Sequence, residues 1–206
     1  MNEKTDKTRK KYNRIAGIYD LFESPMELMA LKKWRITLME QLRGKVLEVG
    51  VGTGKNIEYY PEGLYITAID FSTKMLEKAK KKAKVLNKKV ESLNMDIQKM
   101  DFHDSTFDIV FSTCVFCSVP DPIAGLKEMR RVCKPNGKII MIEHVRSEKK
   151  VLGLIMDILN PIVLNAYGAN INRKTLNSIN SAGFINVYST NLYSDIVKKI
   201  KIVNIK

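Results

Sequence analysis

The chain has 206 residues, of which 45% are hydrophobic and 28% are charged, so it is long enough for one well-buried core and too short for two ordinary domains. This composition excludes a disordered chain, and because no uninterrupted apolar run reaches the roughly 18 residues of a membrane span, we expect no transmembrane helix. The formal net charge of +13 at pH 7 leaves nucleic acid, an anionic membrane or an acidic substrate open as partners.

The positions of the charged residues along the chain bear on which of these partners to expect. Residues 1–11 are polar and lack the apolar core of a secretory signal, so we expect a cytoplasmic protein, with peripheral association with an anionic membrane as a further option. Lysines of the basic cluster at 74–89 fall on one face of an expected helix, which is typical of a solvated surface. Since the sequence has no RNA-binding signature, nucleic acid is not an expected partner.

In chain order, residues 1–43 predict a helical cap, because apolar side chains such as Tyr12, Tyr19, Trp34 and Leu38 recur at helical spacing. In residues 44–206, short apolar runs then alternate with helical segments. Expected strands cover residues 46–49, 65–70, 89–94, 108–114, 138–144, 186–192 and 196–205. Expected helices cover residues 56–60, 74–86, 122–132, 156–164 and 172–182. This alternation predicts one α/β domain with a doubly wound parallel sheet and right-handed crossovers.

The first expected strand ends in a glycine turn. From Val46 the sequence reads VLEVGVGTGKN, and Asp70 closes the next strand. Glycines let the backbone approach a ligand closely, and a carboxylate at that strand end is placed to accept hydrogen bonds from both hydroxyls of a ribose. The order Gly50-x-Gly52-x-Gly54 departs from the dinucleotide fingerprint, so a tight turn with Asp70 as a helix cap is the alternative. We favour a site for a nucleoside-bearing cofactor.

Four stretches together resemble the class I S-adenosylmethionine-dependent methyltransferases. They are the glycine turn with Glu48 before it, residues 68–72 with Met75, residues 107–110, and residues 126–138 with their Pro-x-Gly turn. The resemblance runs from Tyr12 to the C-terminus and implies S-adenosylmethionine as the cofactor and S-adenosylhomocysteine as the product. It also implies a Rossmann-like sheet of seven mostly parallel strands, with one antiparallel strand near the C-terminus, and an N-terminal helical cap that acts as a lid.

The same resemblance assigns the cofactor contacts. The methionine end would lie against Glu48 and the glycine turn, the ribose against Asp70, and the adenine between side chains that follow the second and third strands. Asp96 is preferred over Asp101 as the carboxylate that accepts from adenine, because it directly follows its strand. The expected cofactor-binding residues are Tyr12, Glu48, Gly50, Gly52, Gly54, Asp70, Phe71, Met75, Met95, Asp96 and Cys114.

Two residues are expected to act in catalysis. His144 ends the fifth strand and is a candidate general base, because imidazole titrates near neutral pH; a packed rim histidine is the alternative. The run from Tyr12 through Tyr19 to Asp20 resembles the N-terminal lid of quinone-biosynthesis and phospholipid N-methyltransferases, in which Tyr19 would face cofactor and substrate. Its alternative is an amphipathic helix with tyrosines in the core.

The cysteines do not predict a metal site. Cys114-x-x-Cys117 has the spacing of a zinc or redox motif. A zinc site would need two further ligands, and His103 and His144 are the two imidazoles of the sequence. Because the run is also apolar and lies at a strand end, we expect small packed side chains and no metal.

The acceptor is left open between two subfamilies. The N-terminal run points to quinone and phospholipid enzymes, whereas residues 111–173 resemble alkyl-thiol methyltransferases, with Ala169 where those carry cysteine. The apolar segment 151–167 would cover the acceptor. We therefore expect methyl transfer to a small or lipid-like, apolar acceptor (a phospholipid amine, a quinol or a thiol) and no obligate protein partner. The alternatives are a non-catalytic cofactor-binding protein and an RNA methyltransferase.

Overall fold

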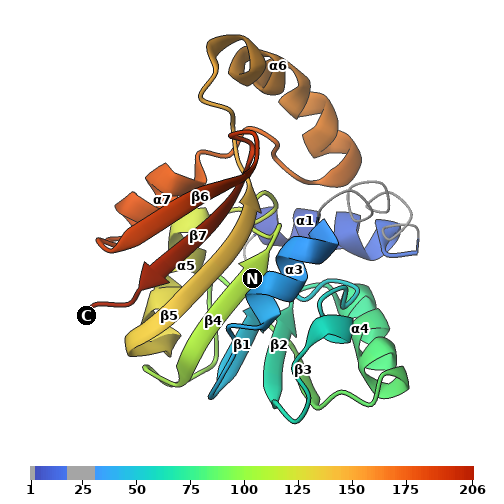
Figure 1. Ribbon diagram of the computed structural model, residues 1–206. Helices are drawn as coiled ribbons and strands as arrows, with labels where there is room; N and C mark the ends of the chain where they lie inside the picture. The colour runs from blue at the N-terminus through green and yellow to red at the C-terminus, as the bar shows by residue number, and fades with distance from the viewer. Residues whose placement is uncertain (1–2, 18–30) are drawn as a thin grey trace.

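One seven-stranded sheet organises the fold in a computed structural model that describes residues 3–17 and 31–206 (Figure 1). The strand order is β3-β2-β1-β4-β5-β7-β6. The strands are β1 Val46–Val49, β2 Ile66–Asp70, β3 Val90–Asn94, β4 Phe107–Thr113, β5 Cys133–His144, β6 Val187–Tyr193 and β7 Val197–Val203. Neighbouring strands are parallel, except that β7 runs antiparallel to β5 and β6. The predicted mostly parallel sheet with one antiparallel strand near the C-terminus is confirmed.

Helices cover both faces of this sheet. The helices are α1 Glu3–Ile15, α3 Lys32–Met39, α4 Thr73–Val85, α5 Pro122–Val132, α6 Lys150–Tyr167 and α7 Thr175–Ser181, with a 3-10 turn η2 at Ile57–Tyr59. One core contains side chains of α5 and α7, and the other contains side chains of α3, η2 and α4. The expected N-terminal helix is present as α1. Tyr19 and its neighbours in residues 18–30 lie outside the described residues.

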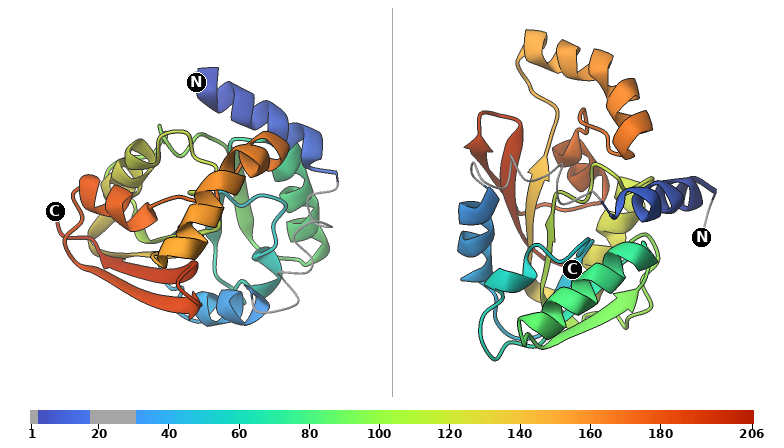
Figure 2. Two further views of the ribbon diagram at one scale, coloured as in Figure 1. Left: turned by 90° about the horizontal axis from the view of Figure 1, so that it is seen from above. Right: turned by 90° about the vertical axis from the view of Figure 1, so that its right-hand side faces the viewer.

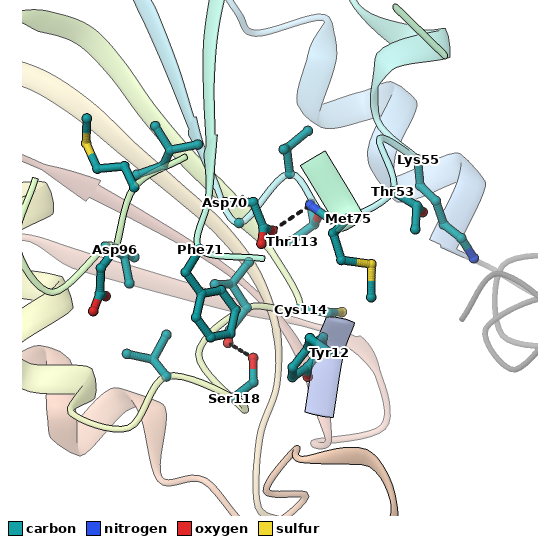
Figure 3. A pocket seen from close by; sticks show the side chains of 18 of the residues that line it. Tyr12, Thr53, Lys55, Asp70, Phe71, Met75, Asp96, Thr113, Cys114 and Ser118 are labelled. Carbon is teal, nitrogen blue, oxygen red and sulfur yellow. Dashed lines mark hydrogen bonds between the residues drawn. The ribbon is translucent and has the colours of Figure 1, made fainter. Parts of the chain in front are cut away.

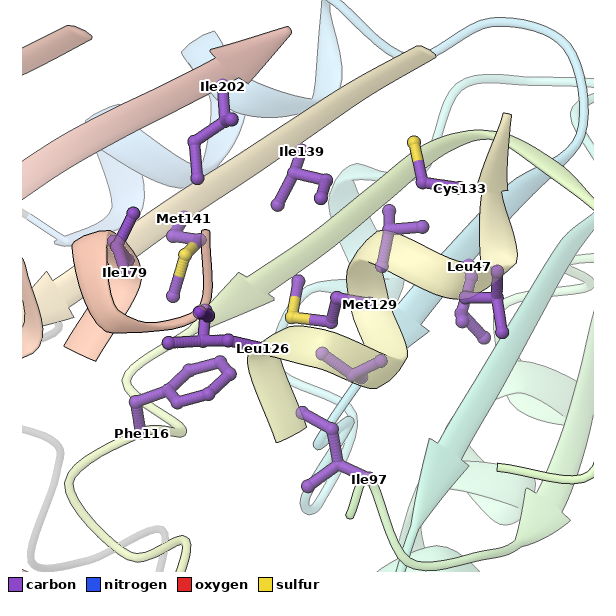
Figure 4. Packing of buried hydrophobic residues seen from close by; sticks show 14 of the residues in the cluster. Leu47, Ile97, Phe116, Leu126, Met129, Cys133, Ile139, Met141, Ile179 and Ile202 are labelled. Carbon is purple, nitrogen blue, oxygen red and sulfur yellow. The ribbon is translucent and has the colours of Figure 1, made fainter. Parts of the chain in front are cut away.

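The side chains of β5 show how the two cores divide. Ile139 and Met141 point to the face covered by α5 and α7, whereas Ile140 and Ile142 point to the opposite face, as the alternation of side chains along a strand requires. All four are buried, which is typical of a parallel strand covered by helices on both sides. Figure 4 shows the first face, where Leu126 of α5 packs among these strand side chains.

Polar caps fix where two sheet-covering helices begin. The backbone N–H of Met75 donates to Ser72 Oγ (3.3 Å) at the start of α4. At the start of α5, Ala124 N–H donates to Asp121 Oδ1 (3.0 Å), and Pro122 occupies the first turn, where no backbone donor is needed. Each cap contributes about 1 kcal/mol and fixes the residue at which its helix begins.

Two elements begin or end differently from their prediction. The prediction of an α-helix at residues 56–60 is wrong, because the structure has only the single 3-10 turn η2 there. Gly54, with φ +83°, lies just before this turn and Pro61 follows it, so a longer helix is not formed. The fifth strand begins at Cys133 rather than at residue 138. Its early start is supported by Asn204, whose side-chain Nδ2 donates to the carbonyl oxygens of Cys133 (2.9 Å) and of Lys134 (3.2 Å).

A helix is expected at residues 156–164, and the observed helix α6 is longer at both ends. Asp157, Asn160 and Pro161, which interrupt the apolar run in the sequence, all lie inside the helix. The helix changes direction along its length (Figure 1), as expected where proline removes a backbone donor. In the described part of the chain, α6 is the one helix long and apolar enough to cross a membrane by length and composition, and only 11% of it is buried.

Candidate functional site

A cavity open to solvent lies at the carboxyl-terminal ends of β1, β2 and β4. Strand order reverses between β1 and β4, and ligands of open α/β sheets bind at such a switch point. The lining residues are Tyr12, Arg35, Gly50, Val51, Gly52, Thr53, Lys55, Ile69, Asp70, Phe71, Met75, Met95, Asp96, Ile97, Gln98, Thr113, Cys114, Val115, Ser118, Val119 and Pro120.

The glycine turn forms one wall of this cavity. The backbone N–H groups of Gly50 and Val51 both donate to the carbonyl oxygen of Ile69, at 2.8 and 3.0 Å, which ties the turn to β2. Gly50 has φ +69°, and a Cβ there would lie 2.5 Å from Val115 of the facing wall. Glycine is therefore required for both the conformation and the close approach of the two walls.

Asp70 links the glycine turn to the start of α4. Its Oδ2 accepts the N–H of Gly52 (2.9 Å), and its Oδ1 accepts the N–H of Ser72 (2.8 Å). Figure 3 shows the Asp70 side chain among the residues that line the cavity. Burial raises the pKa of Asp70 to about 6, against the lowering effect of these two backbone bonds. At neutral pH the group is a largely buried carboxylate held in one orientation.

Aromatic and sulfur side chains form an apolar wall beside Asp70. The rings of Tyr12 and Phe71 lie 5.8 Å apart between centroids, and both pack with Met75 (Figure 3). Helix α1 is held over this wall because Ser72 Oγ donates to Asn13 Oδ1 (2.7 Å). A planar ring would fit against such a surface.

On the other side of the cavity, the loop after β3 carries a second carboxylate. Asp96 Oδ1 accepts both the backbone N–H and the side-chain Nε2 of Gln98, each at 2.9 Å. Met95 also lines the cavity, and its backbone N–H donates to the carbonyl oxygen of Asp70 (3.1 Å). Asp101, the alternative carboxylate, is exposed and is not among the lining residues.

A buried guanidinium was not predicted at this site. Arg35 of α3 is 4% exposed and lines the cavity. Its Nη1 donates to Asn56 Oδ1 (2.6 Å) and to Thr113 Oγ1 (2.9 Å). The sequence does carry a signal for it, because Arg35 falls within the apolar stripe of an expected helix. Arginine is almost never buried unless it is paired, so an arginine on a buried helix face indicates a partner nearby.

Glu48 lies behind this guanidinium and is not among the lining residues. Its Oε1 accepts from Asn56 Nδ2 (2.5 Å), and its Oε2 accepts from the hydroxyl of Tyr60. Burial raises the pKa of Glu48 to about 8, so the side chain is mainly uncharged at neutral pH. In this geometry Glu48 positions Asn56, which in turn holds Arg35.

The loop after β4 forms the remaining wall and rests on a buried carboxylate. The N–H groups of Val115 and Phe116 both donate to Glu143 Oε2 at 3.1 Å. Burial raises the pKa of Glu143 to about 7. Cys114, which lines the cavity, has φ +56°, an uncommon conformation for a residue with a side chain. Such local strain is often found where the backbone serves a site.

His144 ends β5, and it is not among the lining residues. Its Nδ1 is buried and has no hydrogen-bond partner in the part of the chain that the structure describes. Burial disfavours the charged imidazolium and lowers the pKa of His144, so the ring is neutral at pH 7. The structure also shows no group of acidic, histidine and cysteine side chains arranged for a metal ion among the described residues.

The cavity thus gathers most of the residues expected from the sequence. Glu48, Gly54 and His144 lie outside its lining, and Tyr19 lies outside the described residues. A Cβ on Gly54 would lie 3.1 Å from the backbone of Ala79, so this glycine lets the turn pack closely on α4. The expected residues that line the cavity are Tyr12, Gly50, Gly52, Asp70, Phe71, Met75, Met95, Asp96 and Cys114.

Comparison with known proteins agrees with this arrangement. Residues 47–141 match the family described as methyltransferase domain. The chain is 38% identical over 114 residues to a phosphatidylethanolamine N-methyltransferase of Cereibacter sphaeroides, covering 54% of this chain and 56% of that protein. It is 29% identical over 178 residues to a demethylmenaquinone methyltransferase of Staphylococcus haemolyticus, covering 81% and 73%. A thiol S-methyltransferase of Rattus norvegicus is 31% identical over 148 residues, covering 69% and 60%.

Among solved structures, the fold is similar to that of an S-adenosylmethionine-dependent methyltransferase from Thermotoga maritima, described as a possible histamine N-methyltransferase. The TM-score is 0.73 at 20% identity, and the match covers 95% of this chain and 99% of that one. At this identity the likeness concerns the fold. The match to the first curated relative spans little more than half of that protein's length.

Proposed function

We propose that this chain is an S-adenosylmethionine-dependent methyltransferase that transfers the cofactor's methyl group to a small or lipid-like, apolar acceptor, a proposal supported by the match of residues 47–141 to the methyltransferase domain family. The observation that carries this proposal is the cavity at the switch point, where a fixed buried carboxylate, an apolar wall and a buried guanidinium face one space. Each of these features suits a different part of one cofactor.

The described residues fit this cofactor part by part. Asp70 would accept hydrogen bonds from the ribose hydroxyls, while Phe71 and Met75 would pack against the adenine, with Asp96 at its amino group. Arg35 would bind the carboxylate of the methionine part, since a guanidinium pairs well with a carboxylate. The close approach of Gly50 to Val115 leaves no room for a side chain in the wall between these groups.

When bound, the cofactor supplies an electrophilic methyl group on a positively charged sulfur. The chain therefore needs no strong acid, and its main contribution is to align an acceptor atom with that methyl group. Cys114 and Thr113, at the end of β4, line the cavity between the two walls, where they would orient the reacting groups. Exclusion of water by the apolar wall under α1 would protect the site during transfer.

The acceptor proposal rests on the relatives and on the apolar surroundings of the cavity. The three curated relatives are named for phosphatidylethanolamine, demethylmenaquinone and thiol methylation. Val115, Val119 and Pro120 give the cavity an apolar side near its β4 loop. We place the enzyme in the cytoplasm, working on acceptors that partition toward a membrane.

A transfer assay with labelled S-adenosylmethionine tests the proposal. Purified protein is offered phosphatidylethanolamine, a demethylated quinol and an alkyl thiol, and a transfer RNA is included for the competing reaction. We expect label in at least one of the three apolar acceptors and none in RNA. If the cofactor binds tightly and no acceptor is labelled, the chain is a cofactor-binding protein without turnover. Label in RNA alone would contradict the acceptor class.

His144 ends β5 outside the cavity lining, and it is proposed as the general base for an acceptor that extends from the cavity to the end of β5 and must lose a proton. Replacing His144 by alanine should lower turnover about a hundredfold, because general base catalysis typically contributes this much. The dissociation constant of the cofactor should not change, since His144 is not among the residues lining the cavity. Single-turnover rates and calorimetry separate the two effects. Unchanged turnover in His144→Ala would make this histidine a packing residue.

A further inference from the structure

Helix α6 carries its apolar stripe on the outside. A helix on the surface of a globular protein normally turns its apolar stripe toward the core and its polar residues toward water. Along the outward side of α6, six exposed branched apolar side chains recur at three- and four-residue spacing. They are Val151, Leu154, Ile155, Ile158, Leu159 and Ile162, with exposed fractions from 44% for Leu159 to 73% for Val151.

Beside the buried Gly153 and Met156, the inward side of α6 carries polar side chains that are bonded to the rest of the molecule. Asp157 forms an ion pair with Arg146, with 2.7 Å between Oδ2 and Nη2, and its Oδ1 accepts from Asn172 Nδ2 (3.0 Å). Asn160 Oδ1 accepts the backbone N–H of Ile171 (2.9 Å). These bonds hold the helix in place by its polar side, so the apolar stripe is a fixed feature of the surface.

We propose that α6 docks on an anionic phospholipid bilayer, lying in the plane of the headgroups with its apolar stripe among the acyl chains. Exposed apolar surface of this extent and regularity marks an interaction site. Although α6 is long enough to span a membrane, its polar side is bonded to the domain, so only one face of the helix is available to lipid. The in-plane orientation follows from that restriction.

Basic side chains lie at both ends of this stripe and favour an anionic surface. Lys149 and Lys150 are exposed at the start of α6. Helix α1, which contains six basic and two acidic residues, lies beside the other end, where Lys11 Nζ donates to the carbonyl oxygen of Leu164 (2.9 Å). A basic amphipathic surface next to an apolar stripe is attracted to anionic headgroups while the stripe is buried.

Docking through α6 would also bring the cavity to the bilayer. Figure 2 shows α6 passing over the carboxyl-terminal edge of the sheet, where the cavity lies. The segment after α6 is bonded to the cavity wall, since Asn170 N–H donates to the carbonyl oxygen of Cys117 (2.7 Å), next to the lining residue Ser118. The part of this inference that concerns lipid-like acceptors rests on the proposed function, whereas bilayer docking itself does not.

Sedimentation with vesicles tests the docking. Full-length protein is mixed with vesicles of phosphatidylcholine alone or of phosphatidylcholine with phosphatidylglycerol. We expect binding to the anionic vesicles, and the double variant Ile158→Ser, Ile162→Ser should bind about tenfold more weakly. The matched control is Val85→Ser, Ile185→Ser, which removes two exposed apolar side chains elsewhere (83% and 74% exposed) and should bind like the unchanged protein. Circular dichroism should show the same fold in all of them.

A second pair of variants tests the charge. Replacing Lys7 and Lys10 of α1 by glutamine should weaken binding to anionic vesicles, and added salt should reduce the difference. The control replaces Lys80 and Lys84, two exposed lysines of α4, by glutamine. This control should bind anionic vesicles as strongly as the unchanged protein does.

Three results would overturn the docking proposal. The first is equal vesicle binding by the unchanged protein and by the double variant Ile158→Ser, Ile162→Ser. The second is that the unchanged protein does not bind anionic vesicles at all. The third is that the unchanged protein is a dimer and the double variant a monomer, which would make α6 a contact between two copies. Because the assay contains neither cofactor nor acceptor, its failure would leave the proposed methyl transfer untouched. If methyl transfer failed in its own assay, the docking proposal would likewise still be decided by vesicle binding.

Discussion

Replacing Asp70 by alanine is expected to weaken binding of S-adenosylmethionine and S-adenosylhomocysteine about a thousandfold. Two charge-assisted hydrogen bonds to the ribose would be lost, each contributing roughly 2 kcal/mol. The N–H groups of Gly52 and Ser72 would lose their side-chain acceptor as well, so the free energy of unfolding should fall by about 1–2 kcal/mol while the fold is kept. Isothermal titration calorimetry measures the affinity, and denaturant unfolding measures the stability.

Asp101→Ala is the matched control, because Asp101 is an exposed carboxylate outside the cavity lining. It should leave the affinity unchanged. The pH dependence gives a second check. Burial raises the pKa of Asp70 to about 6, and hydrogen bonds from ribose hydroxyls favour its ionised form, so affinity should be full well above pH 6 and fall as pH drops through that value. Asp70→Asn should remove this dependence. Unchanged affinity in Asp70→Ala would contradict the ribose assignment.

Replacing Arg35 by methionine is expected to weaken binding of S-adenosylhomocysteine by about 4 kcal/mol, or about a thousandfold. Removing one partner of a buried, hydrogen-bonded charge pair has effects of this size. Arg35 is held in position by Asn56 and Thr113, so little ordering is needed when a carboxylate binds. Methionine keeps most of the apolar stem, which limits the disturbance of the surrounding packing. Calorimetry with purified protein gives the affinity.

Methylthioadenosine separates binding from folding in this experiment. It contains the adenosine and sulfur parts of the cofactor but no amino-acid carboxylate. Arg35→Met should bind methylthioadenosine as well as the unchanged protein does, whereas Asp70→Ala should lose affinity for both ligands. Equal losses for both ligands in Arg35→Met would mean that the guanidinium holds the cavity together and binds no carboxylate.

The fold could be predicted because its signals are local. Short apolar runs in β1, β2 and β4 are followed by turn or capping residues, and such alternation has few compatible topologies. The glycine turn and Asp70 were found for the same reason, since their roles depend on a spacing along the chain. Their meeting at one sheet edge follows from the parallel pairing of Val46 with Ile66 and of Val49 with Ile69.

Other features depend on contacts between distant segments and could not be predicted. Arg35 is 21 residues from Asn56 and 78 from Thr113, and no local pattern shows that these side chains meet. Glu48 is next to the glycine turn in sequence, yet its strand turns it toward Tyr60 and away from the cavity. The outward stripe of α6 has the spacing of a buried stripe, so the sequence alone could not show which side faces solvent.

The central claim is that the ends of β1 and β2 together bind an adenosyl ligand. Titration of the purified, unchanged protein with S-adenosylmethionine and with S-adenosylhomocysteine tests it most directly. We predict saturable heat with one ligand per chain for each compound. The absence of heat with both compounds, confirmed by the absence of any rise in thermal unfolding temperature, would contradict it.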